Sequence, residues 1–203
     1  MNNLLSLSAI IAAYLLGSLS SAIIVCRVAG LPDPRGQGSG NPGATNVLRF
    51  GGKKLAAIVL LGDMLKGLIP VLIVIALDPG AAIIAATGLA AFIGHLYPLY
   101  FRFRGGKGVA TSVGVIFAFS WLTGLILVAI WLLVSQLIRI SSLAALCAAL
   151  AAPLTLWLVK PVPAYVLAVA VMSIMLIWRH RSNIRNLLNG EEPRIGRKKA
   201  GDG

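Results

Sequence analysis

The chain has 203 residues, of which 58% are hydrophobic and 12% are charged, and its mean hydropathy is +0.90. These values indicate an integral membrane protein and exclude an ordinary soluble domain. The formal net charge is +12, but the cations flank apolar segments and no basic, aromatic-rich domain is present. We therefore expect contacts with anionic lipids or substrates and none with nucleic acid.

Apolar runs of about membrane-spanning length follow one another along the chain, since a helix needs about 20 residues to cross. The first run has no basic segment before it and no small-residue cleavage site after it, which favours a retained span over a signal peptide. Cys26 and Cys147 lie at or within apolar runs and predict neither a disulfide nor a zinc site. The runs are Leu4–Val25, Leu55–Leu77, Gly80–Leu99, Ser112–Ile138, Leu143–Val159 and Ala164–Trp178.

The polar intervals between these runs carry the cations in three clusters, Arg27–Lys54, Arg102–Lys107 and Arg179–Lys199. The positive-inside tendency places all three on the cytoplasmic side. The second and third clusters share a side only if an even number of crossings separates them. The three apolar runs between them, counted as single spans, do not satisfy this condition.

The run Ser112–Ile138 resolves this conflict, because its 27 residues exceed what one span needs and Ser120–Gly124 interrupts it with small polar residues. We predict two short helices hinged near Ser120–Gly124, which places Arg139 inside. One long tilted helix is the alternative, and it would place Arg139 outside.

We therefore predict an all-α integral membrane protein, a bundle of about seven transmembrane helices with the N-terminus outside and the C-terminus cytoplasmic. Residues 1–192 form one polytopic membrane domain. Residues 193–203 form a basic cytoplasmic tail that we expect to be disordered or to lie on the lipid surface.

A polar, glycine-rich run, Ser-Gly-Asn-Pro-Gly-Ala-Thr-Asn, covers Ser39–Asn46 and stands out from the apolar sequence around it. Successive backbone N–H groups in such a run form a nest for anions. Arg49, Lys53 and Lys54 follow and supply the positive charge that phosphate binding requires. The alternative is an ordinary loop whose glycines serve turns and whose cations orient the protein.

A second glycine-rich run, Gly105-Gly-Lys-Gly108, precedes Ala110 and Thr111 at the start of an apolar helix. Glycines at a helix N-terminus permit close approach of an anion, and Lys107 adds a charge. The spacing is not that of a Walker A loop. The alternative is a turn that only follows the positive-inside tendency.

The two histidines lie at the ends of apolar runs. His180 and Asn183 are three residues apart and share a helical face, so we expect them to hydrogen-bond a substrate, whereas His95 is a weaker candidate. Because no carboxylates cluster with either histidine, we expect no metal site. Asp63 and Lys66 lie one turn apart inside a span and are expected to pair, as an anchor between helices or beside an anionic headgroup.

Some common catalytic patterns are absent. The sequence contains no Gly-x-Ser-x-Gly elbow and no catalytic Cys/His pair. Neither histidine has an acid five residues later, because those positions hold Tyr100 and Arg185. The His-x4-Asp pair of common glycerolipid acyltransferases is therefore missing, and an acyltransferase built from this chain must work without that base.

Three ordered motifs resemble those of the bacterial acyl-phosphate:glycerol-3-phosphate acyltransferases, the PlsY family. They are Ser39–Asn46, Gly105–Thr111 and His180–Glu191, and the segments Asp63–Gly67 and Ser141–Leu143 also resemble family segments. The resemblance extends from about Tyr14 to Glu192. In the third motif, Asn186 stands where a basic residue is usual, so no role is assigned to it.

The resemblance implies an all-helical, seven-span enzyme of the bacterial inner membrane with a cytoplasmic active site. It would transfer the acyl group of an acyl phosphate to the 1-hydroxyl of glycerol 3-phosphate, giving lysophosphatidic acid and inorganic phosphate, the first step of phospholipid synthesis. It implies no cofactor. The partners would be the two substrates, membrane lipids and, through functional coupling, an enzyme that makes acyl phosphate.

Residue roles follow from this chemistry and from the matched motif positions. Neutral hydrogen-bonding side chains would act at the reacting groups, while cations, polar groups and glycine amides would hold the phosphates. A substrate phosphate oxygen would accept the hydroxyl proton. The predicted catalytic residues are Thr45, Ser142, His180 and Asn183, and the predicted substrate-binding residues are Ser39, Gly40, Asn41, Gly43, Asn46, Arg49, Gly105, Gly106, Lys107 and Thr111.

Two other classes of protein compete with this hypothesis. A small transporter of phosphorylated metabolites would also place cations and broken helices near spans, but its site is usually near the bilayer midplane between repeats. A non-catalytic lipid-binding subunit would not need paired glycine-lysine and serine-asparagine loops.

Overall fold

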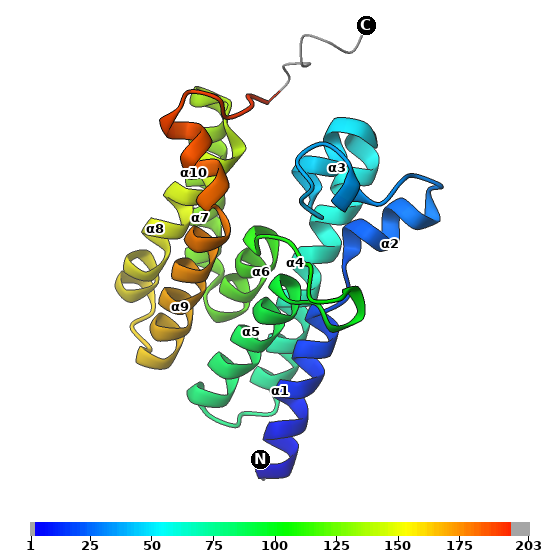
Figure 1. Cartoon of the computed structure of the whole chain (residues 1–203). Coiled ribbons are helices and arrows are strands. Elements are labelled where there is room, and N and C mark those ends of the chain that lie inside the picture. The colour runs from blue at the N-terminus through cyan, green and yellow to red at the C-terminus, as the bar shows by residue number, and fades with distance from the viewer. Residues whose placement is uncertain (1–2, 196–203) are drawn as a thin grey trace, which may run out of the picture.

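The computed structural model describes residues 3–195, and this part of the chain contains helices and connections but no strand (Figure 1). The predicted all-α class is therefore confirmed. The elements are α1 (Asn3–Gly17), α2 (Ser21–Val28), η1 (Pro34–Gly36), α3 (Ala44–Phe50), α4 (Gly52–Ala76), α5 (Ala81–Leu96), η2 (Leu99–Phe101), α6 (Val109–Phe119), α7 (Trp121–Ile138), α8 (Ser141–Val159), α9 (Pro163–Arg179) and α10 (Arg181–Leu188).

Several of these helices are long and apolar enough to cross a membrane. By length and composition, four of the described segments qualify on their own: α4, α7, α8 and the stretch Ala81–Phe101, which joins α5 to η2. Two bent pairs raise the number to as many as six, because α1 with α2 bends by 45° and α9 with α10 bends by 57°. α6 is a shorter apolar helix.

The break between α6 and α7 falls at Ser120, within the segment predicted to hinge. The extended backbone of Ser120 ends α6, and its Oγ caps α7 by accepting hydrogen bonds from the Thr123 amide (3.3 Å) and the Thr123 hydroxyl (3.0 Å). Gly124 lies directly against the Phe117 ring, which keeps the two helices in contact beside the turn. The prediction of two helices in place of one long helix is confirmed.

The first apolar run is not one straight helix. α1 ends at Gly17, which packs against the Ala91 carbonyl of α5, and the Ser18 hydroxyl donates back to the Tyr14 carbonyl oxygen at 2.9 Å. The Leu19 carbonyl in the break accepts a hydrogen bond of 2.7 Å from Lys66 Nζ. A broken helix is tolerated at membrane depth because a partner satisfies the freed backbone group.

Asp63 and Lys66 form the ion pair predicted from their spacing, with Lys66 Nζ 2.8 Å from Asp63 Oδ1 and both side chains buried. Because Lys66 also binds the Leu19 carbonyl, the pair fastens α4 to the α1–α2 connection. Of the two roles considered for this pair, an anchor between helices and a position beside an anionic headgroup, these contacts correspond to the anchor.

Glycines allow α4 and α6 to pack closely. Gly67 of α4 lies against the Thr111 carbonyl, and Gly114 of α6 lies against the Met64 carbonyl, so a side chain at either position would collide with the neighbouring backbone. Such contacts between small residues are a common basis of helix association in membranes. They fix the start of α6 and therefore the Gly105–Gly108 turn that precedes it.

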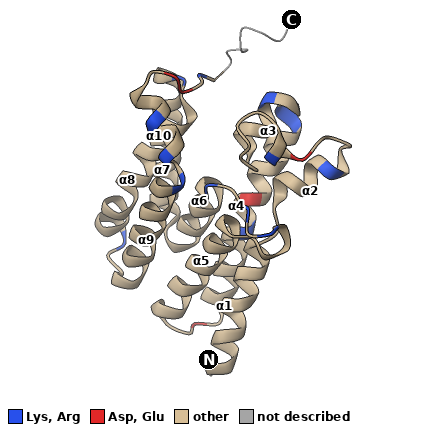
Figure 2. Ribbon diagram, viewed as in Figure 1, with Lys and Arg blue, Asp and Glu red and all other residues tan. Residues whose placement is uncertain are grey.

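Lysine and arginine gather in the half of the bundle that carries α2, α3, α10 and the α5–α6 connection (Figure 2). The end at which α1 begins carries few charged segments in the same view. Of the predicted basic tail, residues 193–195 are described, and the Ile195 amide donates to the Arg139 carbonyl oxygen at 2.6 Å. Residues 196–203 lie outside the described part of the chain.

Candidate active site

The first polar loop is organised by Asn46. Its buried side chain donates from Nδ2 to the carbonyl oxygens of Pro34 and Gln37 and accepts from the Ser39 amide, each at 2.9 Å. A direct role on substrate was predicted for Asn46, but in this structure its amide group holds the loop together.

The same loop uses its own amides in tight turns. The Gly40 amide donates to Gln37 and the Gly43 amide to Asn41, each at 2.9 Å. Gly40 also has a positive φ of 70°, a conformation that glycine adopts without strain. In the predicted nest, the amides of Ser39, Gly40 and Gly43 are therefore engaged within the loop, while the Ser39 and Arg49 side chains remain exposed.

The second glycine loop is clamped by Arg179, which sequence reasoning did not select. Its guanidinium donates to the carbonyl oxygens of Gly105 (2.8 Å) and Gly106 (3.1 Å). Gly108, with a φ of 90°, is the N-cap residue directly before α6. The position of Arg179 directly before the third motif was the available signal, and it was interpreted only as part of a cationic cluster.

Lys107 extends from this loop to the third motif, where its ammonium group donates to Asn183 Oδ1. Burial lowers the pKa of Lys107, and the nearby charges of Arg49 and Arg179 lower it further, while the Glu192 carboxylate opposes the change. Several cations therefore surround one partly buried site. Such a site attracts an anion with more than one negative charge, as phosphate has.

A carboxylate that sequence reasoning missed lies in the middle of this cluster. Glu192 Oε1 accepts hydrogen bonds from the Ser142 hydroxyl and from Asn183 Nδ2, each at 2.6 Å. Its Oε2 is buried and has no partner among residues 3–195. Glu192 therefore joins the start of α8 to α10.

His180 lies at the bend between α9 and α10 and is buried. Its Nδ1 lies 2.8 Å from the Leu176 carbonyl oxygen. Because a carbonyl only accepts, Nδ1 carries the proton, and Nε2 is left to accept a hydrogen bond from a hydroxyl.

The remaining predicted residues lie around this cluster. Thr45 at the start of α3 is exposed, with its hydroxyl 3.3 Å from that of Ser141, so the first loop reaches the start of α8. Asn41 is half-buried in the first loop. Thr111 is fully buried beside Gly67, and its hydroxyl has no hydrogen-bond partner within the described chain.

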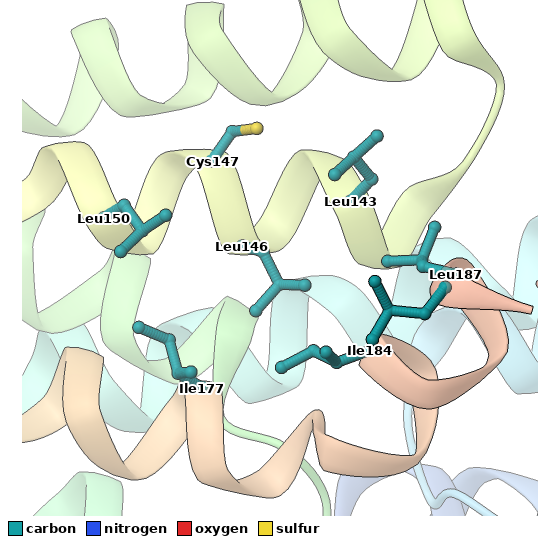
Figure 3. Close-up of a pocket in the computed structure, with 8 residues that line it drawn as sticks. Leu143, Leu146, Cys147, Leu150, Ile177, Ile184 and Leu187 are labelled. Atoms are coloured by element: carbon teal, nitrogen blue, oxygen red, sulfur yellow. The ribbon is translucent and has the colours of Figure 1, made fainter.

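An apolar groove of about 320 Å³ opens beside the polar cluster, between α8, α9 and α10 (Figure 3). Leu143 follows Ser142 in the chain, and Ile184 follows Asn183, so the groove begins next to two residues of the site. Only hydrocarbon and one thiol line it, from Leu143, Leu146, Cys147, Leu150, Ile177, Ile184, Leu187 and Leu188.

An apolar groove with a few convergent charged and hydrogen-bonding groups beside it is the usual form of a ligand-binding site. The model of the glycerol-3-phosphate acyltransferase family matches residues 7–190. The chain therefore belongs to the glycerol-3-phosphate acyltransferase family and is an acyltransferase.

Individual relatives and solved structures agree with this assignment. Proteins named glycerol-3-phosphate acyltransferase from Thioalkalivibrio sulfidiphilus and Methylococcus capsulatus are 57% and 54% identical, over 96% and 92% of this chain and 96% and 94% of their own lengths. A crystal structure of PlsY, described as an integral membrane glycerol 3-phosphate acyltransferase in its glycerol 3-phosphate form, has a TM-score of 0.90. It is 41% identical, with 94% of this chain and 96% of that chain covered. The lysophosphatidic acid form has a TM-score of 0.88, 40% identity and coverages of 94% and 95%.

Proposed function

We propose that this enzyme transfers the acyl group of an acyl phosphate to the 1-hydroxyl of glycerol 3-phosphate. The hydroxyl oxygen attacks the acyl carbonyl carbon, the bond from that carbon to the phosphate oxygen breaks, and lysophosphatidic acid and inorganic phosphate are formed. This is the first step of phospholipid synthesis. The similar PlsY structures in glycerol 3-phosphate and lysophosphatidic acid forms support the acceptor and the product.

The observation that carries the proposal is the network in which Lys107 donates to Asn183 and Glu192 binds both Asn183 and Ser142. It places a cation and neutral hydrogen-bonding groups at the mouth of an apolar groove. A phosphate would lie at the cation and an acyl chain in the groove of Figure 3. The reacting carbonyl of an acyl phosphate would then lie between them.

The chemistry of an acyl phosphate suits a site without a strong base. A mixed carboxylic-phosphoric anhydride is already activated, because phosphate is a good leaving group. The enzyme then has to position two substrates and stabilise the charge that develops on the carbonyl oxygen. An oxygen of the departing phosphate accepts the hydroxyl proton, so His180 is not required as a base.

Most of the predicted residues have a role in this proposal. Ser39, Arg49 and Lys107 bind the phosphates together with backbone amides at the start of α6, since the first turn of that helix leaves N–H groups without intrahelical partners. Thr45 and Ser142 orient the acyl phosphate. His180 Nε2 accepts from a glycerol hydroxyl, and Asn183 binds beside it. Asn46 acts indirectly, through the shape of its loop.

We also propose that the site faces the cytoplasm of a bacterial inner membrane. If α6 is counted with the six candidate spans, the bundle crosses seven times, and its N- and C-termini lie on opposite sides. The gathering of cations at one end of the bundle (Figure 2) supports a cytoplasmic assignment for that end. A functional partner there would be the enzyme that supplies acyl phosphate.

Lys107→Ala tests the proposed phosphate site, and Arg27→Ala is its control because Arg27 is an exposed cation of α2. A charge-assisted hydrogen bond contributes about 1.5–3 kcal/mol, so we expect kcat/KM to fall by roughly 10- to 100-fold in Lys107→Ala. Arg27→Ala should retain its activity. Normal KM and kcat in Lys107→Ala would remove the phosphate-binding role of Lys107.

A further inference from the structure

The Gly105–Gly106 turn rests directly on His95, near the end of α5. The Gly106 amide donates to the His95 carbonyl oxygen at 3.2 Å. A Cβ at Gly106 would overlap the imidazole Nε2, and a Cβ at Gly105 would overlap the His95 carbonyl oxygen. Neither glycine has a positive φ. Glycine is therefore needed here for close approach to His95 and not for its backbone conformation.

A buried ion pair in α4 lies on the other side of the His95 ring. Asp63 Oδ1 lies 3.6 Å from His95 Nδ1 and 2.8 Å from Lys66 Nζ. The first distance exceeds that of a hydrogen bond, but charges and dipoles attract strongly at this range in a buried site. The ring therefore presents Nδ1 to Asp63 and Nε2 to Gly106, while Lys66 is itself held by the Leu19 carbonyl.

The turn is thus confined from two sides, by His95 and by the guanidinium of Arg179, which binds its two carbonyl groups. Lys107 follows Gly106 directly and reaches Asn183. Because the ammonium group is placed by the backbone of this turn, a shift of the turn moves the cation away from the site.

We propose that His95, oriented by Asp63, is a positioning residue that holds the Gly105–Gly106 turn in the shape that presents Lys107 to a substrate phosphate. His95 itself does not touch the substrate in this role. The inference rests on the proposed phosphate-binding role of Lys107, which Lys107→Ala tests independently.

His95→Ala removes the surface on which the turn rests. We expect KM for glycerol 3-phosphate to rise about tenfold, with a smaller change in kcat, since a displacement of about 1 Å can cost up to 100-fold in rate. His95→Gln retains a polar group near Gly106 and should recover most of the affinity. Thr87→Ala is the control, because Thr87 is a fully buried polar residue of the same helix.

A merely structural role for His95 gives a different result. The thermal midpoint in detergent would fall in both His95→Ala and Thr87→Ala, while KM for glycerol 3-phosphate stayed normal in each. That result would overturn the proposal. Equal KM values for His95→Gln and His95→Ala would also count against it, because then the polar group beside Gly106 has no effect.

A double-variant cycle tests the contact directly. Gly106→Ala should raise KM for glycerol 3-phosphate, because its Cβ collides with the His95 ring. In the His95→Ala background the space is vacant, so the same substitution should raise KM much less. Additive effects of the two substitutions would show that ring and turn are not in contact in the active enzyme.

Comparison of the His95 variants with Lys107→Ala separates this inference from the proposed function. If Lys107→Ala raises KM but the His95 variants do not, only the positioning role fails. If Lys107→Ala leaves KM unchanged, the phosphate-binding role fails and the positioning proposal fails with it. Gly106→Ala and His95→Gln keep the test decisive if His95→Ala does not fold.

Discussion

Glu192→Gln removes the negative charge at the centre of the polar cluster with little change in shape. The carboxylate accepts two hydrogen bonds of 2.6 Å through one oxygen, from Ser142 and from Asn183. A hydrogen bond to a charged group contributes about 1.5–3 kcal/mol and a neutral one about 0.5–1.5 kcal/mol. The two weakened bonds therefore cost roughly 2 kcal/mol together.

The second carboxylate oxygen adds to this cost. Glu192 Oε2 is buried without a partner within residues 3–195, so the amide nitrogen of glutamine placed there would have no acceptor. An unsatisfied buried donor costs about 1–3 kcal/mol. The total is about 3–5 kcal/mol, enough to lower the thermal midpoint by roughly 10 °C for a protein of this size.

The assay is thermal unfolding in detergent together with the acyltransfer rate, with Glu191→Gln as the control because the neighbouring Glu191 is exposed. Ser142→Ala removes only one of the two hydrogen bonds and should cost less. In the double variant the two effects should be clearly non-additive, because they share a bond. A Glu192→Gln protein as stable and as active as Glu191→Gln would refute this reasoning.

Two further predictions concern the groove and the hinge. Leu146→Trp should fill part of the 320 Å³ groove. We expect kcat/KM to fall by roughly 100-fold more for long-chain acyl phosphates than for short-chain ones, since each methylene displaced from the groove loses about 0.8 kcal/mol. Equal losses for both chain lengths would place the acyl chain elsewhere. Ser120→Ala removes the cap of α7 and should cost about 1 kcal/mol of stability without changing KM for either substrate, and an altered KM would contradict a purely structural hinge.

Much of the helical layout could be predicted because the thickness of the bilayer sets the length of the apolar runs and the orientation of the protein sets the side on which cations lie. The hinge at Ser120 followed from a run that is too long for one span and from the even number of crossings required between the second and third cation clusters. The α1–α2 break did not follow, because its cause lies far along the chain. Lys66 satisfies the Leu19 carbonyl, and a buried lysine does not reveal in sequence which backbone group it binds.

The motifs of the candidate site were selected from the sequence, but the contacts between them were not predicted. Lys107 and Asn183 were selected from separate motifs, and the structure joins them. Arg179 was missed because a cation at the end of a span is also what membrane orientation requires. Glu192 was missed because a carboxylate is unexpected where phosphates bind. The structural contacts of Asn46 did not follow from the sequence because its partners are backbone groups.

The most direct test of the proposed reaction is phosphate release by the purified protein given acyl phosphate, with and without glycerol 3-phosphate, and with acyl-CoA as the control donor. We predict release that requires glycerol 3-phosphate, formation of lysophosphatidic acid in equal amount, and no product from acyl-CoA. Transfer from acyl-CoA, with acyl phosphate left intact, would contradict both the proposed donor and the mechanism without a side-chain base.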